Sequence, residues 1–418
     1  MLIHSASQLL TLAGAPQRGA DLGRLEIIPD GAVLIRGETI IETGTSEALL
    51  SKYPNEERLN ARNKVVMPGL VDPHTHLIWA GDRAAEFEMR LQGKTYMQIM
   101  AAGGGIASTV NATRAASKQD LYAQTRQRAL AMFRNGTTTA EAKSGYGLEL
   151  TSELTQLELL LKLDAEGPLE LMPTFLGAHA IAPEYKGRPD AYTDLICQQM
   201  LPALKDWWLQ YAATRTFPFV DVFCEDGAFD LAQTRRILST AKTLGFPLKL
   251  HVDEFENLGG ASLAAELGAA SADHLVKTSV ADIKAFARSD TVAVSLPCTP
   301  FGLAQNQYTP AQEIIAAGGL LAIASDINPG TAWCETMQFV IALACRTLKL
   351  TPAQAVAAAT INAAAAIQRE RVIGSLEPGK QADLLILSVE DYRHLAYRFG
   401  GSLVKTVIKK GKVYPINS

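Results

Sequence analysis

The sequence predicts an α/β fold built on a parallel sheet, either open or closed into a barrel. In the middle of the chain, short apolar runs alternate with longer segments whose leucines recur at helical spacing, as at Leu154, Leu157 and Leu160. Such alternation is typical of β/α units, whose strands pair in parallel. The eight predicted strands cover residues 65–71, 137–142, 169–176, 220–224, 248–252, 272–275, 292–296 and 320–324.

The two ends of the chain have a different pattern, in which short runs of strand-forming residues follow one another as in hairpins. These runs cover residues 32–36, 39–42, 383–387 and 403–408. They predict one small β domain built from both termini, of residues 1–63 and 370–418, beside a central domain of residues 64–369.

Two helix starts are marked by capping residues. Thr309-Pro310-Ala311-Gln312 and Thr351-Pro352-Ala353-Gln354 each place Thr at the N-cap, Pro in the first turn and Gln at the third helical position. The alanine-rich residues 355–366 are predicted to form one closely packed helix.

Composition narrows the class of protein. Of 418 residues, 48% are hydrophobic and 20% charged, which is typical of a globular protein with a large core. The formal net charge of −4 offers no basic surface for nucleic acid or anionic membrane, so neither is expected as a partner. Five cysteines without a C-x-x-C pair favour a reducing compartment. With no signal peptide and no apolar run of about 18 residues, we expect a cytoplasmic protein.

Histidines gather where the predicted strands end. Five of the seven lie there, namely His74, His76, His179, His251 and His274. In a β/α barrel the carboxyl ends of the strands form the rim on which active sites are assembled. The distribution therefore indicates a reactive rim.

The histidine pair at the first strand predicts a metal site. His74 and His76 are two residues apart, so both imidazoles point to the same face of an extended chain. His251 and Asp326, at other strand ends, can supply a third and a fourth ligand. Three imidazoles and one carboxylate suit Zn²⁺ or Fe rather than Ca²⁺ or Mg²⁺. The alternative, two histidines in a polar turn, leaves the matching positions of His251, His274 and Asp326 unexplained.

At this point the sequence resembles a known superfamily. Residues 67–76, MPGLVDPHTH, resemble the opening strand of the amidohydrolase superfamily, and residues 374–384, GSLEPGKQADL, resemble its return into a small β domain. The resemblance covers essentially the whole chain. It implies a distorted (β/α)8 TIM barrel beside a small β-sandwich domain formed by both termini.

A narrower resemblance is to the imidazolonepropionase family of that superfamily. The stretches that carry it are residues 79–83 (WAGDR), 103–106 (GGGI), 141–148 (EAKSGYGL), 175–179 (FLGAH) and 325–331 (SDINPGT). The resemblance implies a homodimeric, metal-dependent hydrolase of histidine degradation, which opens the ring of 4-imidazolone-5-propanoate to N-formimidoyl-L-glutamate.

The resemblance also implies roles for individual residues. The implied ligands of one Zn or Fe ion per chain are His74, His76, His251 and Asp326. The implied substrate-binding residues are Arg83, Tyr146, His179, Glu254, Asn328, Gly330 and Thr331.

The chemistry fits these residue types. Hydrolysis of a cyclic amide needs a nucleophile at neutral pH, and a bound metal lowers the pKa of water from 15.7 towards about 7. Asp326 can take the proton of that water, His274 can hold the water or the oxyanion, and Glu254 can exchange a proton with a ring nitrogen. Which of these three catalytic candidates activates the water is left open.

The substrate contacts have simpler alternatives. Arg83 can bind a propanoate through two parallel hydrogen bonds, or it can form an ordinary surface pair with Glu86. His179 and Tyr146 are expected to contact the ligand, although each can instead belong to the core. Tyr96 is a further candidate for the propanoate.

The number of metal ions depends on the fourth strand. Many superfamily members hold two metals bridged by a carboxylated Lys there, whereas residues 222–225 here read VFCE. The absence of Lys favours one ion, with Glu225 left as an alternative bridge.

Two other functions compete with this interpretation. His251 and Glu254 form the H-x-x-E spacing that ring deaminases of the guanine or cytosine type also use, although Arg83 would then lack a propanoate to bind. The second is a scaffold protein that has lost its chemistry, which the complete set of candidate ligands disfavours.

Overall fold

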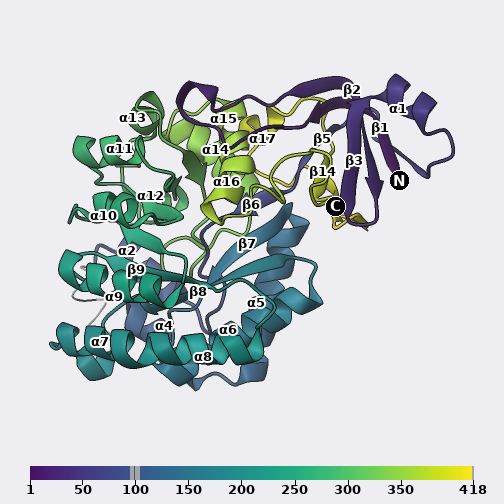
Figure 1. The fold of residues 1–418 in the computed structure, drawn as a ribbon. Helices are drawn as coiled ribbons and strands as arrows, with labels where there is room; N and C mark the ends of the chain where they lie inside the picture. The colour runs from purple at the N-terminus through teal and green to yellow at the C-terminus, as the bar shows by residue number, and fades with distance from the viewer. Residues whose placement is uncertain (95–97, 99–103, 417–418) are drawn as a thin grey trace.

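The computed structural model describes residues 1–94, 98 and 104–416, and it contains two eight-stranded sheets (Figure 1). One sheet curves into a barrel surrounded by helices, and the other lies beside it near both chain ends. The predicted contact by Tyr96 lies outside the described residues. Within the described part of the chain, no helix is long and apolar enough to cross a membrane.

The barrel confirms the predicted parallel sheet, because every neighbouring pair of its strands is parallel. Its strands, in spatial order, are β6 (Leu70–Asp72), β7 (Thr137–Lys143), β8 (Glu170–Ala178), β9 (Phe219–Cys224), β10 (Lys249–Val252), β11 (Ser271–His274), β12 (Val292–Ser295) and β13 (Leu321–Ile323). Seven of these strands lie within a residue or two of the predicted ranges.

The barrel is closed between its first and last strands by contacts just beyond their ends. The backbone N–H of Asp326 donates to the carbonyl of His74 at 3.2 Å, and the N–H of His76 donates to the carbonyl of Ile327 at 2.9 Å. Below them, the N–H of Ser325 donates to the Asp72 carboxylate at 3.1 Å. This seam joins segments that are far apart in the sequence, and it carries three of the predicted metal ligands.

Helices cover the outside of the barrel, and one helix packs on the terminal sheet (Figure 1). The α-helices are α1 (Ser46–Lys52), α2 (Ala84–Leu91), α4 (Ile106–Ala115), α5 (Lys118–Arg134), α6 (Leu150–Glu166), α7 (Pro189–Leu195), α8 (Leu201–Tyr211), α9 (Leu231–Leu244), α10 (Gly260–Leu267), α11 (Val280–Phe286), α12 (Cys298–Gly302), α13 (Ala311–Ala316), α14 (Met337–Thr347), α15 (Pro352–Ala358), α16 (Ile361–Ala366) and α17 (His394–Tyr397).

The second sheet combines strands from both ends of the chain, as predicted. Along the sheet the order is β16 (Lys412–Pro415), β15 (Val404–Lys409), β14 (Leu384–Leu387), β5 (Val65–Pro68), β1 (Leu2–Leu10), β2 (Ile27–Arg36) and β3 (Thr39–Thr45), with β4 (Arg58–Asn60) also paired to β1. The sheet is mixed, because β1 runs parallel to β4 and β5 but antiparallel to β2.

The prediction of a single strand over residues 65–71 is wrong. The chain changes sheets at Gly69: β5 belongs to the terminal sheet, and β6 opens the barrel. The N–H of Gly69 donates to the carbonyl of Asp383 at 3.0 Å. A Cβ at Gly69 would lie 2.2 Å from Thr138 Oγ1, so the crossing point has no room for a side chain. We therefore propose a domain boundary between Pro68 and Gly69 rather than between residues 63 and 64.

One of the two predicted helix caps is confirmed. The N–H of Gln354 donates to Thr351 Oγ1 at 3.2 Å, and the N–H of Thr351 donates to Gln354 Oε1 at 2.9 Å, which completes a capping box. The cap predicted at Thr309 is wrong. Its hydroxyl donates to the carbonyl of His274 at 2.7 Å, and α13 begins at Ala311 without a side-chain cap. The Thr309 hydroxyl therefore binds a residue distant in the sequence instead of capping its own helix.

The single helix predicted over residues 355–366 is also wrong. The chain bends at Thr360, whose φ of −129° and ψ of −94° are not helical, so α15 and α16 are separate helices. The bend lets α16 pack against β12 and β13, where Asn362 Nδ2 donates to the carbonyl of Leu321 at 2.9 Å.

Candidate active site

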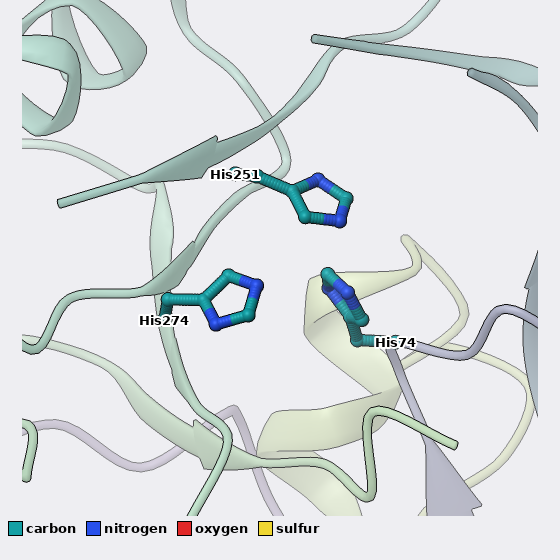
Figure 2. Close-up of side chains that lie close together, drawn as sticks. All are labelled: His74, His251 and His274. Atoms are coloured by element: carbon teal, nitrogen blue, oxygen red, sulfur yellow. The ribbon is translucent and has the colours of Figure 1, made fainter. Parts of the chain in front are cut away.

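The predicted metal ligands converge at the seam of the barrel. His74 and His76 lie in the segment just after β6. Their Nε2 atoms are 3.4 Å and 3.5 Å from Asp326 Oδ1. His76 Nε2 also lies 3.2 Å from His251 Nε2. All four side chains are buried. Figure 2 shows the rings of His74, His251 and His274 turned toward one another.

The free lone pairs of this cluster fit a cation. His74 Nε2 and Asp326 Oδ1 are buried and have no hydrogen-bond partner among the described residues. Two imidazole nitrogens 3.2 Å apart repel one another unless a proton or a cation lies between them. Donor atoms about 2.1 Å from a tetrahedral zinc lie about 3.4 Å from one another. The observed separations of 3.2–3.5 Å match that spacing, so the residues fit one Zn or Fe ion.

His274 belongs to the same cluster. Ligand atoms of His74, His251 and His274 lie within 4.8 Å of one another, as do those of His74, His76 and Asp326. The two groups share only His74, whose ring centroid lies 5.3 Å from that of His76 and 5.4 Å from that of His274. This position suits the predicted role of His274, in which it holds a water or an oxyanion beside the ion.

Carboxylates behind the histidines orient the rings. Asp273 Oδ2 lies 2.6 Å from His74 Nδ1, and Asp221 Oδ2 lies 3.0 Å from His251 Nδ1. Asp273 holds a proton on Nδ1 of His74, which leaves the Nε2 lone pair of that ring facing the cluster, and Asp221 lies within ion-pair distance of His251 Nδ1. Burial and the nearby Lys143 ammonium hold the pKa of His74 well below its usual range, so this ring is neutral as a ligand must be.

A buried ion network supports these carboxylates from below. Lys143 Nζ lies 2.8 Å from Glu141 and 2.7 Å from Asp221, and Lys249 Nζ lies 3.6 Å from Asp273. Burial alone would lower the pKa of Lys143, but Asp221, Glu141 and Asp273 together raise it, so the ammonium stays charged. The sequence analysis missed this network. Its signal was present, because charged residues rarely lie inside apolar strands of a parallel sheet unless they are paired.

The backbone is strained at three rim positions. Asp326 has a φ of 53°, His274 of 80° and Asp253 of 56°, all in the left-handed region that costs a side chain about 1–2 kcal/mol. Strain of this kind persists where the surrounding structure imposes it and often marks functional positions. Asp326 is also held by Thr299, whose hydroxyl donates to Oδ2, and burial raises the pKa of Asp326 to about 6.

Glu254 lies close to His274, and Glu225 binds the backbone of the loop that follows Glu254. His274 Nε2 lies 3.7 Å from Glu254 Oε2. Burial and the negative charges of Asp326 and Glu225 raise the pKa of Glu254 well above its usual range, so Glu254 is suited to donate a proton. The oxygens of Glu225 accept the backbone N–H groups of Phe255 at 2.9 Å and Glu256 at 3.0 Å. They are therefore committed to the loop, which argues against Glu225 as a bridge to a second metal.

Two predicted substrate contacts lie against the histidines. The ring of His179 stacks on His76 with centroids 4.7 Å apart, and its Nδ1 donates to the carbonyl of Gly145 at 3.0 Å. Tyr146 lies 5.2 Å from His179 and 5.9 Å from His76, between ring centroids. His179 thus has the backbone partner of a core histidine and also lies next to the metal ligands.

Arg83 and Glu86 do form the pair that the sequence left as an alternative, but the pair is largely buried. Arg83 Nε donates to Glu86 Oε2 at 2.8 Å, and Nη2 donates to the other carboxylate oxygen. Their side chains are only 15% and 9% exposed. A Cβ at Gly330 would lie 2.2 Å from Arg83 Nη1, so a side chain at this position would displace the guanidinium.

The loop after β13 is shaped by Asn328. Its Oδ1 accepts the N–H groups of Gly330 and Thr331, both at 2.8 Å, and its Nδ2 donates to the carbonyl of Asp326 at 2.7 Å. The side chain of Asn328 is therefore occupied within the loop. It positions Asp326 on one side and Gly330 on the other.

A cavity of about 300 Å³ opens beside this loop. The residues that line it include Asp82, Arg83, Phe87, Arg90, Gly330 and Trp333. Burial raises the pKa of Tyr146, the charge of Asp326 raises it further, and the charges of Arg83 and Arg128 lower it. Gly330 connects the two parts of the site, because it lines this cavity and lies four residues after Asp326.

Structural neighbours share the fold. Guanine deaminase of E. coli superposes with a TM-score of 0.69 over 100% of this chain and 99% of that chain, at 14% sequence identity. The 5-methylcytosine deaminase of Klebsiella pneumoniae gives a TM-score of 0.74 over 100% and 98%, at 17% identity. At such identities the likeness is one of fold alone.

Sequence relatives are much more similar. A protein of Herpetosiphon aurantiacus named imidazolonepropionase is 51% identical, over 99% of this chain and 96% of the relative. One of Chloroflexus aggregans with the same name is 49% identical, over 100% and 99%. The sequence pattern of the amidohydrolase family matches residues 65–414. With its histidine cluster and barrel, the chain belongs to the amidohydrolase family and, within it, to the imidazolonepropionases.

Proposed function

We propose that the chain hydrolyses 4-imidazolone-5-propanoate to N-formimidoyl-L-glutamate by attack of water on the cyclic amide carbonyl. The observation that carries the proposal is the buried cluster of His74, His76, His251 and Asp326, whose facing nitrogen and oxygen atoms lie 3.2–3.5 Å apart. The loop that follows Asp326 leads to Gly330, which lines a cavity together with Arg83 and Arg90. The full-length similarity to proteins named imidazolonepropionase supports the same reaction. The hydrolase uses a metal ion and a small-molecule substrate.

In this proposal His74, His76, His251 and Asp326 hold one Zn or Fe ion. When bound, such an ion supplies a nucleophilic water near neutral pH and polarises the carbonyl. Asp326 accepts the proton of the attacking water, because its Oδ1 lies 3.4 Å and 3.5 Å from the Nε2 atoms of His74 and His76.

The other catalytic roles follow from position. His274, whose Nε2 lies 3.7 Å from Glu254, holds the developing oxyanion. Glu254, kept protonated by burial and by neighbouring carboxylates, delivers a proton to the ring nitrogen that leaves. His179 and Tyr146 lie over the ring, and Arg83, with the backbone of Gly330 and Thr331, lies on the side of the propanoate.

Three finer features belong to the proposal as well. The ion is zinc or iron, since the donor set accepts both. The active form is a homodimer, as the resemblance implies. The enzyme works in the cytoplasm, with neither nucleic acid nor membrane as a partner, which agrees with its net charge of −4.

The test is turnover by the metal-loaded protein. Freshly prepared 4-imidazolone-5-propanoate is added, and loss of ring absorbance is followed together with formation of N-formimidoyl-L-glutamate. We expect turnover that a chelator abolishes and that added Zn or Fe restores. A protein that retains its ion and leaves this substrate unchanged would refute the proposal.

The deaminase alternative is tested in the same assay. The H-x-x-E spacing of His251 and Glu254 is its support in the sequence. Guanine and cytosine replace the imidazolone, and release of ammonia is measured. We expect none, since neither base offers a carboxylate to the arginine-lined cavity.

A further inference from the structure

Three charged residues share one face along α2. Arg83 precedes the helix, and Glu86 and Arg90 follow at spacings of three and seven residues, which place all three side chains on the same side. Arg83 and Arg90 both line the cavity of about 300 Å³. Arg90 was not among the residues to which the sequence analysis gave a role.

The charge of Arg83 is already balanced. Two of its nitrogens donate to the Glu86 carboxylate, and the pair is largely buried. Glu86 also accepts the N–H of Gly105 at 2.8 Å, which fixes the carboxylate in place. A neutral pair with a fixed carboxylate offers an incoming anion hydrogen-bond donors but little net attraction.

The charge of Arg90 is not balanced in this way. Its Nη2 donates to the carbonyl of Gly330 at 2.7 Å, which is a neutral acceptor. Its Nε is buried and has no hydrogen-bond partner within the described residues. No carboxylate of the described chain lies within ion-pair distance of the Arg90 guanidinium, although Asp82 lines the same cavity. Arg90 thus brings to one wall of the cavity a positive charge that has no carboxylate of the described chain within ion-pair distance.

We propose that Arg90 is a specificity-determining residue that gives the site its preference for a substrate with a carboxylate side chain. The inference rests on the proposed function for the identity of that side chain, the propanoate. Arg83 donates hydrogen bonds to the substrate side chain. Arg90 supplies a positive charge, which attracts a carboxylate on the substrate but not an uncharged group. The bond from Arg90 to Gly330 keeps this charge beside the loop that Asn328 shapes.

The test compares two stable inhibitors, 3-(imidazol-4-yl)propanoate and its uncharged propanamide. Inhibition constants are measured for the metal-loaded enzyme and for Arg90→Met, Arg90→Lys and Arg346→Met. Arg346 is the matched control, because it also donates to backbone carbonyls and lies over an aromatic ring, that of Phe399, as Arg90 lies over Phe87. Metal content and thermal unfolding are recorded for each variant.

We expect the native enzyme and Arg346→Met to bind the propanoate about 10- to 100-fold more tightly than the propanamide, as expected for a charged hydrogen bond. Arg90→Met should remove most of that preference, and Arg90→Lys should keep part of it. If Arg90→Met weakens both inhibitors equally, Arg90 only positions Gly330, and the proposal is overturned. An unchanged preference in Arg90→Met overturns it as well.

The two proposals fail in different ways. An enzyme that prefers the propanoate but leaves 4-imidazolone-5-propanoate intact would refute the proposed reaction and retain the role of Arg90. An enzyme that turns over the imidazolone without any preference between the inhibitors would do the opposite.

Discussion

The rim of the barrel and the layer just below it both bury charged and titratable side chains, but they satisfy them differently. In the lower layer, Glu141, Lys143, Asp221, Lys249 and Asp273 form ion pairs with one another. At the rim, His74 Nε2 and Asp326 Oδ1 have no partner in the described part of the chain. Each charge of the lower layer has an opposite charge within 4.0 Å, although Asp221 Oδ1 and Asp273 Oδ1 accept no hydrogen bond from the described residues. The rim instead gathers lone pairs with no cation of the described chain between them.

The two layers depend on each other. A buried unpaired group costs free energy, so an open rim is tolerated only if something holds it in place. The carboxylates of Asp221 and Asp273 belong to both layers, since each contacts a lysine below and a histidine above. From this difference we infer that the ion pairs of the lower layer hold the histidines in place, and that the rim binds the ion and the substrate. The following predictions test that division, from the largest effect to the smallest.

The first prediction breaks the rim. His76→Ala removes one of four donors, so the ion and the turnover should be lost together. Metal content by mass spectrometry and the ring-opening assay measure both. His394→Ala, in the C-terminal region, is the control and should change neither. Full activity of His76→Ala would exclude His76 as a ligand.

The second prediction separates proton transfer from metal binding at the rim. Glu254→Gln keeps the shape of the side chain but loses the titratable proton, so kcat should fall about 10²- to 10⁴-fold with the ion retained. Glu256→Gln, an exposed neighbour, should leave kcat unchanged. If Glu254→Gln loses the ion, Glu254 is a ligand instead of a proton donor.

The third prediction breaks the lower layer. Lys143→Met leaves Glu141 and Asp221 without their cation, which should lower the free energy of unfolding by about 3–5 kcal/mol. Because Asp221 orients His251, metal affinity should also fall about 10- to 100-fold in a chelator competition. In the control Lys118→Met, an exposed pair with Glu158 is lost, at a cost of no more than about 1 kcal/mol. Equal stability of the two variants would contradict a structural role for the layer.

The fourth prediction concerns the contact between the barrel and the terminal sheet. Burial tends to raise the pKa of Glu170, but Lys409, Gln381 and Arg369 together lower it from 4.5 to about 2. Because the pKa is lower in the folded state, the stabilisation is complete above pH 4.5 and is lost as the pH falls towards 2. It amounts to about 3 kcal/mol.

Urea unfolding of the native protein and Glu170→Gln over this pH range isolates that contribution. The difference between their unfolding free energies should shrink as the pH falls towards 2. A difference that stays constant with pH would show that the Glu170 carboxylate is not coupled to Lys409.

Much of the fold was predictable because its signals are local. An apolar run bounded by polar residues forms a strand whichever partner it finds, and seven of the eight predicted strands recur in the barrel. The capping box at Thr351 needs only residues three positions apart. Thr309 carries the same motif, but its hydroxyl binds the carbonyl of His274, which no local pattern reveals.

The wrong predictions have the same cause as the missing cap at Thr309, namely contacts between residues that are distant in the sequence. Residues 65–71 read as one apolar run, but the run is divided because its two halves pair with different sheets. The bend at Thr360 serves the packing of α16 below the barrel. Buried lysines such as Lys143 and Lys249 were visible in the strands, but their partners lie on neighbouring strands and are known only once the barrel is closed.

By itself, the sequence determined which side chains can bind a metal ion and at which strand ends they lie. It could do so because strand periodicity and chain order depend only on residues close together in the sequence. Only the tertiary structure decided that His74 and Asp326 meet, since they are joined by the closing of the barrel between its first and last strands. It also decided that Arg90 donates to the carbonyl of Gly330, 240 residues away, and has no carboxylate of the described chain within ion-pair distance. Contacts between distant segments depend on how the whole barrel packs, and no short stretch of sequence contains that information.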